Sequence, residues 1–281
     1  SIGLLFGTVV ATSHAIGRNA PAECGPIWRR SLPYAFFLGV AGMALCHTGG
    51  WFFEMTGQPP SVSEGGGRVI GILGYGRPGF LLYVTTTHFL ESLRRPMPAM
   101  MVMIAANGLN VWFNWLLIFG NAGFPALGAE GAAWSSALVR VAMPVMLLAY
   151  VWWMPGRDRY GVRGKLEKDW WRRGRTQRRY GFATSASYTV EESAFSALGF
   201  FAGMLGALSL AAYTVQNVSI AFVFMAALGV GSATSVRVGI AHGRGDWSNR
   251  AMAAWTGMAL VSLPLGVVGA GVVFLPAVIA A

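Results

Sequence analysis

Long apolar runs alternate with short polar connections along the whole chain. The runs fall at residues 1–17, 31–53, 67–90, 97–120, 129–154, 180–204, 208–236 and 251–275. Each is close to the length that crosses about 30 Å of hydrocarbon at about 1.5 Å per residue. Only helices and closed barrels satisfy their backbone groups in lipid, and runs of this length are helical. The pattern therefore predicts an all-α, polytopic bundle with eight transmembrane helices.

The composition supports a membrane protein over a soluble one. Hydrophobic residues make up 54% of the 281 residues, charged residues make up 11%, and the mean hydropathy is +0.52. A soluble domain carries about 25% charged residues. Two cysteines, Cys24 and Cys46, are too few for a disulfide framework or a four-ligand zinc site. Ser1 and Ala281 each stand inside an apolar run, so we expect that the chain is cut at both ends.

The basic residues test the helix count independently, because successive connections alternate between the two sides of a membrane. All of them except Arg68, Arg77 and Arg140 lie in or beside the connections after the first, third, fifth and seventh helices. The connections 54–66 and 121–128, on the opposite side, contain no Lys or Arg. The positive-inside rule places the basic side in the cytoplasm.

A weak internal repeat extends the expected helix count. A shift of 226 residues aligns Gly3, Ala15, Gly17 and Arg18 with Gly229, Ala241, Gly243 and Arg244. The last three of these pairs end helices that run toward the cytoplasm, the first and the seventh of the chain. A six-helix repeat about an axis along the membrane normal follows, which is a known transporter plan. On this plan one helix is expected before Ser1 and three after Ala281.

The densest basic segment, residues 156–179, divides the chain into two expected bundles. Residues 1–155 are expected to form a first bundle that lacks its first helix, and residues 180–281 the first half of a second bundle. Trp170 and Trp171 among the basic residues would suit nucleic acid. A cytoplasmic loop drawn to anionic lipid headgroups explains the same residues without such a partner. We therefore expect the lipid bilayer, and no nucleic acid, as a partner.

Three blocks of sequence, in order, carry a family resemblance. They are Phe89-Leu90-Glu91-Ser92 through Pro98-Ala99-Met100, Asn107 to Asn114 with Pro125-Ala126-Leu127-Gly128, and Glu191-Glu192-Ser193-Ala194-Phe195 with Val236-Arg237-Val238-Gly239. These blocks resemble the multidrug and toxic compound extrusion (MATE) family in its NorM-like branch, over about helices 2 to 9 of 12. The resemblance implies a secondary active exporter of amphipathic or cationic drugs in the bacterial cytoplasmic (inner) membrane. Export of the drug would be driven by exchange for H+ or Na+ and would proceed by alternating access. The family often has Gln where His14 stands.

Two adjacent carboxylates, Glu191 and Glu192, are the candidates for coupling to the ion. They lie well inside the run 180–204, where an ionised carboxylate costs several kcal/mol unless it meets water, a cation or a partner. Neighbouring positions lie about 100° apart on a helix, so at most one points into a central cavity. The resemblance assigns the exchange to Glu191, because Glu-x-Ser-Ala-Phe is the family's pattern. An acid paired with Ser, Tyr or another helix is the alternative reading of both residues.

Amides inside the runs are candidates for a substrate or ion cavity. Asn110 and Asn114 are four residues apart and so share a helix face. Polar stripes in lipid either join helices or line a wet cavity. By resemblance, Asn110, Asn114 and Ser136 would ligate an ion without binding a proton. Gln216 and Asn217, expected at the start of the seventh helix, either face the cavity or make a helix–helix hydrogen bond.

The remaining residues restrict the other function classes. His14, His47, His88 and His242 have no metal-ligand spacing, and no GxSxG, HExxH or P-loop motif occurs. We expect no cofactor besides the coupling ion, no enzyme activity, organic cations as substrates and a monomer. A lipid-linked oligosaccharide flippase is an alternative, but it needs a cationic cavity and only Arg77 and Arg140 lie inside the helices. A membrane-embedded enzyme that pairs Glu191 with a histidine is the other alternative.

Overall fold

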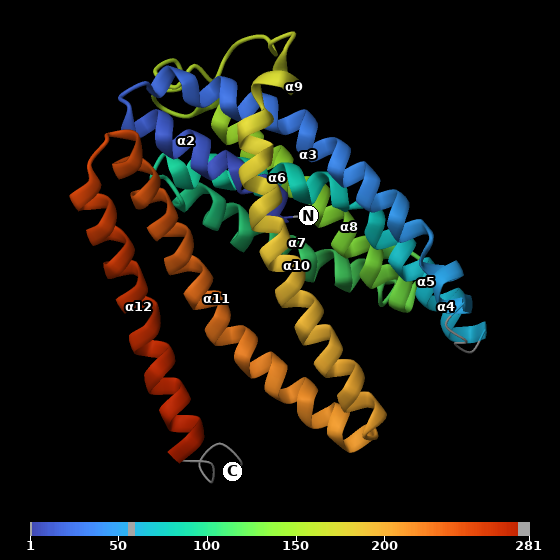
Figure 1. Cartoon of the computed structure of the whole chain (residues 1–281). Coiled ribbons are helices and arrows are strands. Elements are labelled where there is room, and N and C mark those ends of the chain that lie inside the picture. Colours follow the sequence, from blue (N-terminus) through green and yellow to red (C-terminus); the bar gives the residue numbers. More distant parts are fainter. Residues whose placement is uncertain (1, 56–59, 275–281) are drawn as a thin grey trace. The chain divides into compact units, whose positions relative to one another are not determined.

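The computed structural model describes residues 2–55 and 60–274, and this part of the chain consists of helices joined by short connections. Ser1, Ala281 and the end of the last expected run lie outside the described residues. The helices are α1 (Ile2–Leu5), α2 (Gly7–Gly17), α3 (Cys24–His47), α4 (Gly49–Met55), α5 (Pro60–Tyr75), α6 (Arg77–Ser92), α7 (Met97–Leu117), α8 (Gly128–Trp153), α9 (Trp170–Arg173), α10 (Arg175–Met204), α11 (Ala207–Gly243) and α12 (Trp247–Phe274). Figure 1 shows their order along the chain.

Every predicted run is helical, but three of the runs are interrupted. The run 1–17 breaks at Phe6, the run 31–53 breaks at Thr48, and the run 67–90 breaks at Gly76. At Gly76 the cause is local, because Pro78 lies two residues further on and has no backbone N–H to continue the preceding helix. Within the described residues, α7, α8 and α11 are each long and apolar enough to cross a membrane, and the bent segment Pro21–Met55 is a fourth candidate.

The described chain divides into two compact units. The first contains Ser1–Thr12 and Pro21–Gly181, and the second contains Ser13–Ala20 and Phe182–Ala281. These boundaries differ from the expected division at two places: the end of α2 groups with the second unit, and the basic segment 156–179 groups with the first. Helix α2 therefore begins in one unit and ends in the other.

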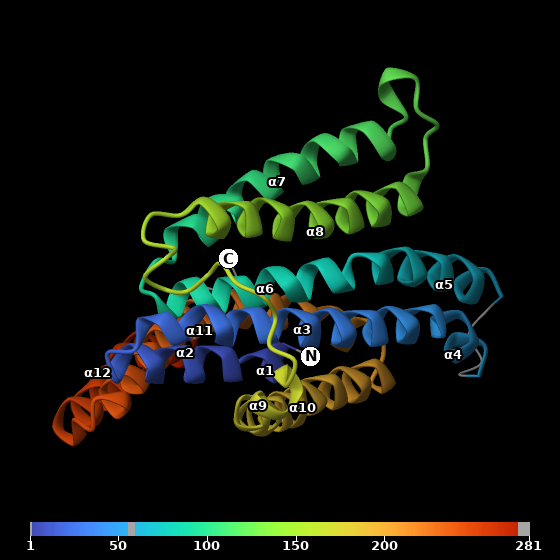
Figure 2. The same cartoon turned by 90° about the horizontal axis from the view of Figure 1, so that it is seen from above.

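Helix α6 is the centre of the first unit. It packs against α3 on one side and α8 on the other, and α7 packs on the far side of α8, so that Figure 2 shows these four helices as successive layers. Phe89 and Leu90 of α6 are fully buried. The indole of Trp28 stacks on Phe89 with ring centroids 5.4 Å apart and donates a hydrogen bond to Thr86, 3.3 Å away.

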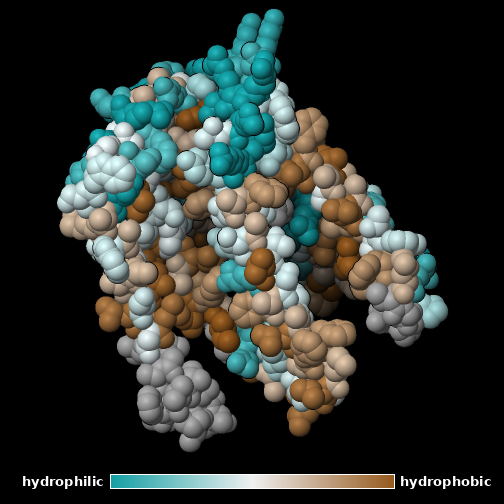
Figure 3. All heavy atoms as spheres, viewed as in Figure 1, coloured by the Kyte–Doolittle hydropathy of each residue, from teal (hydrophilic) through white to brown (hydrophobic). Residues whose placement is uncertain are grey.

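The basic segment between α8 and α10 is anchored to the first unit. Arg29 of α3 donates hydrogen bonds to the carbonyl oxygens of Gly161 and Val162, at 2.5 and 2.7 Å. At the start of α10, the amide of Gln177 donates to the hydroxyls of Thr8 (3.0 Å) and Ser31 (2.5 Å). In Figure 3, hydrophilic residues gather at the end of the molecule that carries this segment, whereas hydrophobic residues lie along the helices.

In the second unit, α2 and α11 meet through glycines. A Cβ atom at Gly17 would lie 2.2 Å from the carbonyl oxygen of Ile240, and one at Gly243 would lie 2.4 Å from the carbonyl oxygen of His14. A Cβ atom at Gly239 would lie 2.7 Å from that of Ser13. Gly17 and Gly243, like Ser13 and Gly239, are related by the 226-residue shift of the sequence repeat. Equivalent positions of the two repeats therefore touch each other at this crossing.

Candidate functional site

A polar chain joins α7 to α8 in the first unit. The amide of Asn114 donates to the side-chain oxygen of Asn110 at 3.0 Å, and the amide of Asn110 donates to the hydroxyl of Ser135 at 3.3 Å. The Ser135 hydroxyl in turn donates to the backbone oxygen of Asn110 at 3.2 Å. Ser136, the predicted ligand on α8, is not the serine that bonds to Asn110, and its proposed role in binding an ion stays a prediction. The two serines point in directions about 100° apart, and Ser135 is the buried one.

The side-chain oxygen of Asn114 stands at the end of this series of hydrogen bonds. It is buried and has no hydrogen-bond partner among the described residues. A buried acceptor without a partner is costly, so this oxygen is suited to a donor or a cation. Both asparagines carry no charge, so the polar chain can ligate an ion but cannot bind a proton at neutral pH.

Glu191 and Glu192 lie in the second half of α10. Glu191 is half-buried and Glu192 is exposed. In the described part of the chain neither carboxylate makes an ion pair or a hydrogen bond. Glu191 is about 20 Å from the end of α10 at Met204, at about 1.5 Å per residue. The structure thus places an unpaired carboxylate near the middle of a long helix.

Gln216 and Asn217 lie inside α11, rather than at its start as predicted, because α11 begins at Ala207. Asn217 donates to the Tyr213 hydroxyl at 3.3 Å, and that hydroxyl donates to the backbone oxygen of Phe195 in α10 at 2.6 Å. The bond of Asn217 thus lies within α11, and Tyr213 makes the bond between the two helices. Gln216 is exposed.

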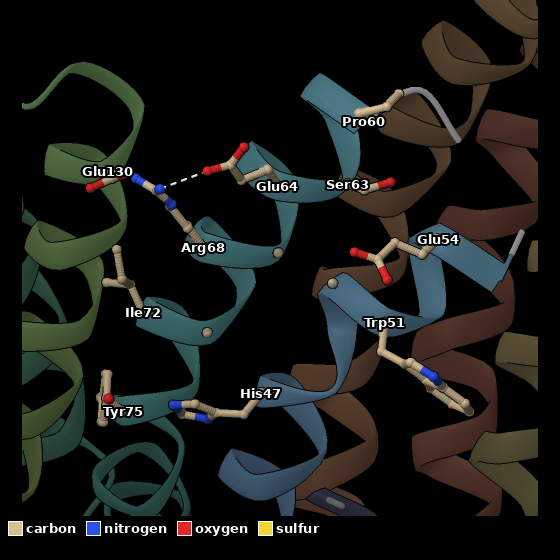
Figure 4. A pocket seen from close by; sticks show the side chains of 13 residues that line it. His47, Trp51, Glu54, Pro60, Ser63, Glu64, Arg68, Ile72, Tyr75 and Glu130 are labelled. Carbon is tan, nitrogen blue, oxygen red and sulfur yellow. Dashed lines mark hydrogen bonds and ion pairs between the residues drawn. The ribbon is translucent and has the colours of Figure 1, made fainter. Parts of the chain in front are cut away.

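A further site, which the sequence did not reveal, is an acidic pocket of about 970 Å³ formed by α3, α4, α5 and the start of α8. The Arg68 guanidinium lies between two carboxylates, 2.7 Å from Glu64 and 3.6 Å from Glu130. Figure 4 shows Glu54 on the opposite wall. The ring of His47 meets that of Tyr75 edge-on, with centroids 5.1 Å apart.

The pocket has an excess of negative charge, since three carboxylates face one guanidinium. It also lies on the side that the positive-inside rule assigns to the exterior. The sequence contained one sign of this pocket: Glu54 and Glu64 both lie in the connection 54–66, which has no basic residue. Only the fold brings Glu130 close to them.

The two arginines inside the helices lie near each other in the first unit. Arg140 lies over the ring of Phe80, with its guanidinium carbon 5.7 Å from the ring centroid. Arg77 is exposed at the start of α6, close enough to Arg140 for the two positive charges to repel each other. These positions do not decide against the flippase alternative.

Long apolar helices that carry amides and carboxylates in their interiors are typical of a multi-pass membrane protein with a functional site inside the membrane. The MatE family model matches residues 1–116. A probable multidrug resistance protein NorM of Caulobacter vibrioides is 38% identical over 272 residues, covering 96% of this chain and 56% of the relative. A protein of the same name from Mesorhizobium japonicum is 28% identical and covers 91% of this chain and 55% of the relative.

Solved structures show the same fold. The eukaryotic MATE transporter AtDTX14 superposes with a TM-score of 0.86 at 18% identity, over 96% of this chain and 59% of that one. A MOP superfamily transporter from Pyrococcus furiosus superposes with a TM-score of 0.80 at 21% identity, over 99% and 61%. The chain belongs to the MATE family. It spans a little over half the length of these relatives.

Family membership confirms the predicted helical membrane fold and excludes the enzyme alternative, because the relatives are transporters. The predicted site residues stay predictions. The structure brings Asn110 and Asn114 together with Ser135, and it leaves Glu191 without a partner among the described residues.

Proposed function

We propose that the protein exports amphipathic, cationic organic compounds across the bacterial cytoplasmic membrane in exchange for H+ or Na+. Alternating access of two bundles would carry the exchange, with residues 156–179 on the cytoplasmic side. The names of the NorM relatives, which describe multidrug resistance, support the cargo. We propose that the protein works as a monomer and needs no cofactor besides the coupling ion.

The observation that carries this proposal is the Glu191 carboxylate in the middle of α10. An unpaired charge in the membrane costs several kcal/mol, so it persists in a transporter where water, an ion or a cationic cargo periodically meets it. Because no described guanidinium holds Glu191 permanently, its charge can be neutralised by an incoming ion. That neutralisation would weaken the hold on a cationic cargo and bias the two-state balance toward release.

The polar chain of Asn110, Asn114 and Ser135 supports a second, complementary role. Its open acceptor at Asn114 suits a cation or a donor group of the cargo. Since amides do not titrate at neutral pH, coupling to protons would fall on Glu191. The acidic pocket near Glu54 and Glu130 adds a surface that attracts cations on the proposed export side.

The test is gradient-driven export of ethidium from proteoliposomes by a Glu191→Gln variant. We expect a loss of between about 5- and 150-fold in rate, the range of typical coupling free energies. Glu192→Gln is the matched control, since it removes a neighbouring and more exposed carboxylate from the same helix. It should retain export close to that of the unchanged protein.

Two results would contradict the proposal. One is export by Glu191→Gln at the rate of the unchanged protein under either an H+ or a Na+ gradient. The other is an equal loss in both variants, which would indicate a general effect of charge on α10. Thermal unfolding of each variant separates such losses from a failure to fold.

A further inference from the structure

Two histidines face each other where α2 crosses α11. The ring centroids of His14 and His242 are 4.7 Å apart, with the planes tilted by 40°. The backbones are in contact around them, because Gly17, Gly239 and Gly243 leave no side chains in between. His14 is half-buried and its neighbour Ala15 is fully buried. The imidazole pair therefore sits at a tight contact between the helices, where a change in its charge acts directly on the packing.

A guanidinium lies beside the His242 ring. The Arg250 guanidinium approaches the Nδ1 atom of His242 at 3.3 Å. Arginine has donors only, so a hydrogen bond at this contact needs Nδ1 as its acceptor. Arg250 is held in place by the Trp247 ring, whose centroid is 3.7 Å from the guanidinium carbon. Protonation of Nδ1 would set a donor against a donor and a positive ring against a guanidinium.

The charged groups near the pair are predominantly positive. Arg18 follows His14 at the end of α2, and Arg244 and Arg250 lie in the turn after α11 and on α12. The one carboxylate in that turn, Asp246, accepts hydrogen bonds from the backbone and the side chain of Asn249 instead. A proton added to either imidazole therefore meets arginines and the other ring, with no carboxylate hydrogen-bonded to the rings to offset it.

We propose that His14 and His242 form a proton-sensitive latch, which holds the end of α2 against α11 when both rings are neutral and releases it when they are protonated. Histidine gains its charge between about pH 8 and 5, which is the range of cellular pH changes. Because α2 begins in the first unit and ends in the second, release would free the last turns of that helix. The latch goes beyond the proposed export function, since it does not depend on which ion or cargo is exchanged.

The test is a distance measurement by pulsed electron paramagnetic resonance. Spin labels at Ala20→Cys and Ser248→Cys report on the end of α2 and on the α11–α12 body, in a background that carries Cys24→Ala and Cys46→Ala. We expect one short distance at about pH 8 and a second, longer one at about pH 5. The ratio of long to short should rise by about five-fold or more, the effect of one repulsive contact between like charges in water.

Matched variants distinguish the latch from a general effect of acid. His14→Gln and His242→Gln keep a polar neutral side chain and should hold the short distance at both pH values. His47→Gln and His88→Gln, which change histidines elsewhere in the chain, should leave the pH response intact. His242→Lys places a permanent charge at the crossing and should show the longer distance already at about pH 8.

The proposal is overturned if the doubly labelled protein shows no pH response. It is also overturned if the response persists in both glutamine variants. Neither measurement involves transport, so a failure of the export proposal leaves the outcome for the latch unaffected. A failure of the latch leaves the Glu191 experiment unaffected in the same way.

Discussion

Helices α8 and α11 are both apolar enough to cross a membrane, but they are covered very differently. In the most apolar stretch of α8, 39% of the residues are buried within the protein, whereas in that of α11 none is. Hydropathy therefore predicts that a helix enters an apolar environment, and it does not predict whether protein or lipid provides that environment. The two helices differ because α8 lies between α6 and α7, while α11 packs mainly on α12 within a chain that spans a little over half the length of its relatives.

The difference extends to polar side chains. In the first unit, Gln177 lies in a closed network with Thr8 and Ser31. In the second unit, Glu192 of α10 and Gln216 of α11 are exposed. The same type of substitution should therefore have different effects in the two regions.

The largest contrast is expected between two leucines. Leu90→Ala removes a side chain that is 0% exposed and should lower the free energy of unfolding by about 2–5 kcal/mol. Leu208→Ala in α11 removes one that is 85% exposed and should change it by less than about 0.5 kcal/mol. Thermal unfolding can be followed with a thiol-reactive dye in a Cys46→Ala background, because Cys46 is partly exposed whereas Cys24 is fully buried and reacts only after unfolding. Equal melting temperatures for the two variants would contradict the predicted difference between α6 and α11.

A smaller contrast is expected between two glutamines. Gln177→Ala leaves the hydroxyls of Thr8 and Ser31 and the Arg30 guanidinium without their shared partner, and should cost about 1–3 kcal/mol. Gln216→Ala, at an exposed position of α11, is the control and should stay within about 0.5 kcal/mol. The same unfolding assay checks both. A larger loss at Gln216 would mean that this amide has a partner essential for stability.

The smallest effect is expected at Asp246, in the exposed turn of the second unit. Hydrogen bonds from the backbone and the side chain of Asn249 lower the pKa of this carboxyl below its ordinary value of 3.8. Its contribution to stability is therefore complete at neutral pH and is lost as the pH falls through the lowered pKa. In a pH series of melting temperatures, Asp246→Ala should lie slightly below the unchanged protein near pH 7, and the two should converge below about pH 3. A constant offset at all pH values would contradict this role.

Much of the fold could be predicted from the sequence, because long apolar runs leave the backbone no alternative to helices. The missed features depend on quantities that a single sequence does not contain. The hydrogen bonds of Ser135 to Asn110 were not predicted, since two adjacent serines differ only in direction. The meeting of Glu130 with Glu64, and of His14 with His242, joins residues that are far apart in the chain. The break at Gly76 had a visible signal in Pro78, but its position inside an apolar run favoured a continuous helix.

The glycine crossing of α2 and α11 has a consequence for its symmetry. Ser13 meets its repeat mate Gly239, and Gly17 meets its repeat mate Gly243. A contact between like positions is the geometry of a two-fold interface. A larger side chain at one position of this crossing would therefore press on its own repeat mate, as it would on the same residue of the partner in a two-fold dimer.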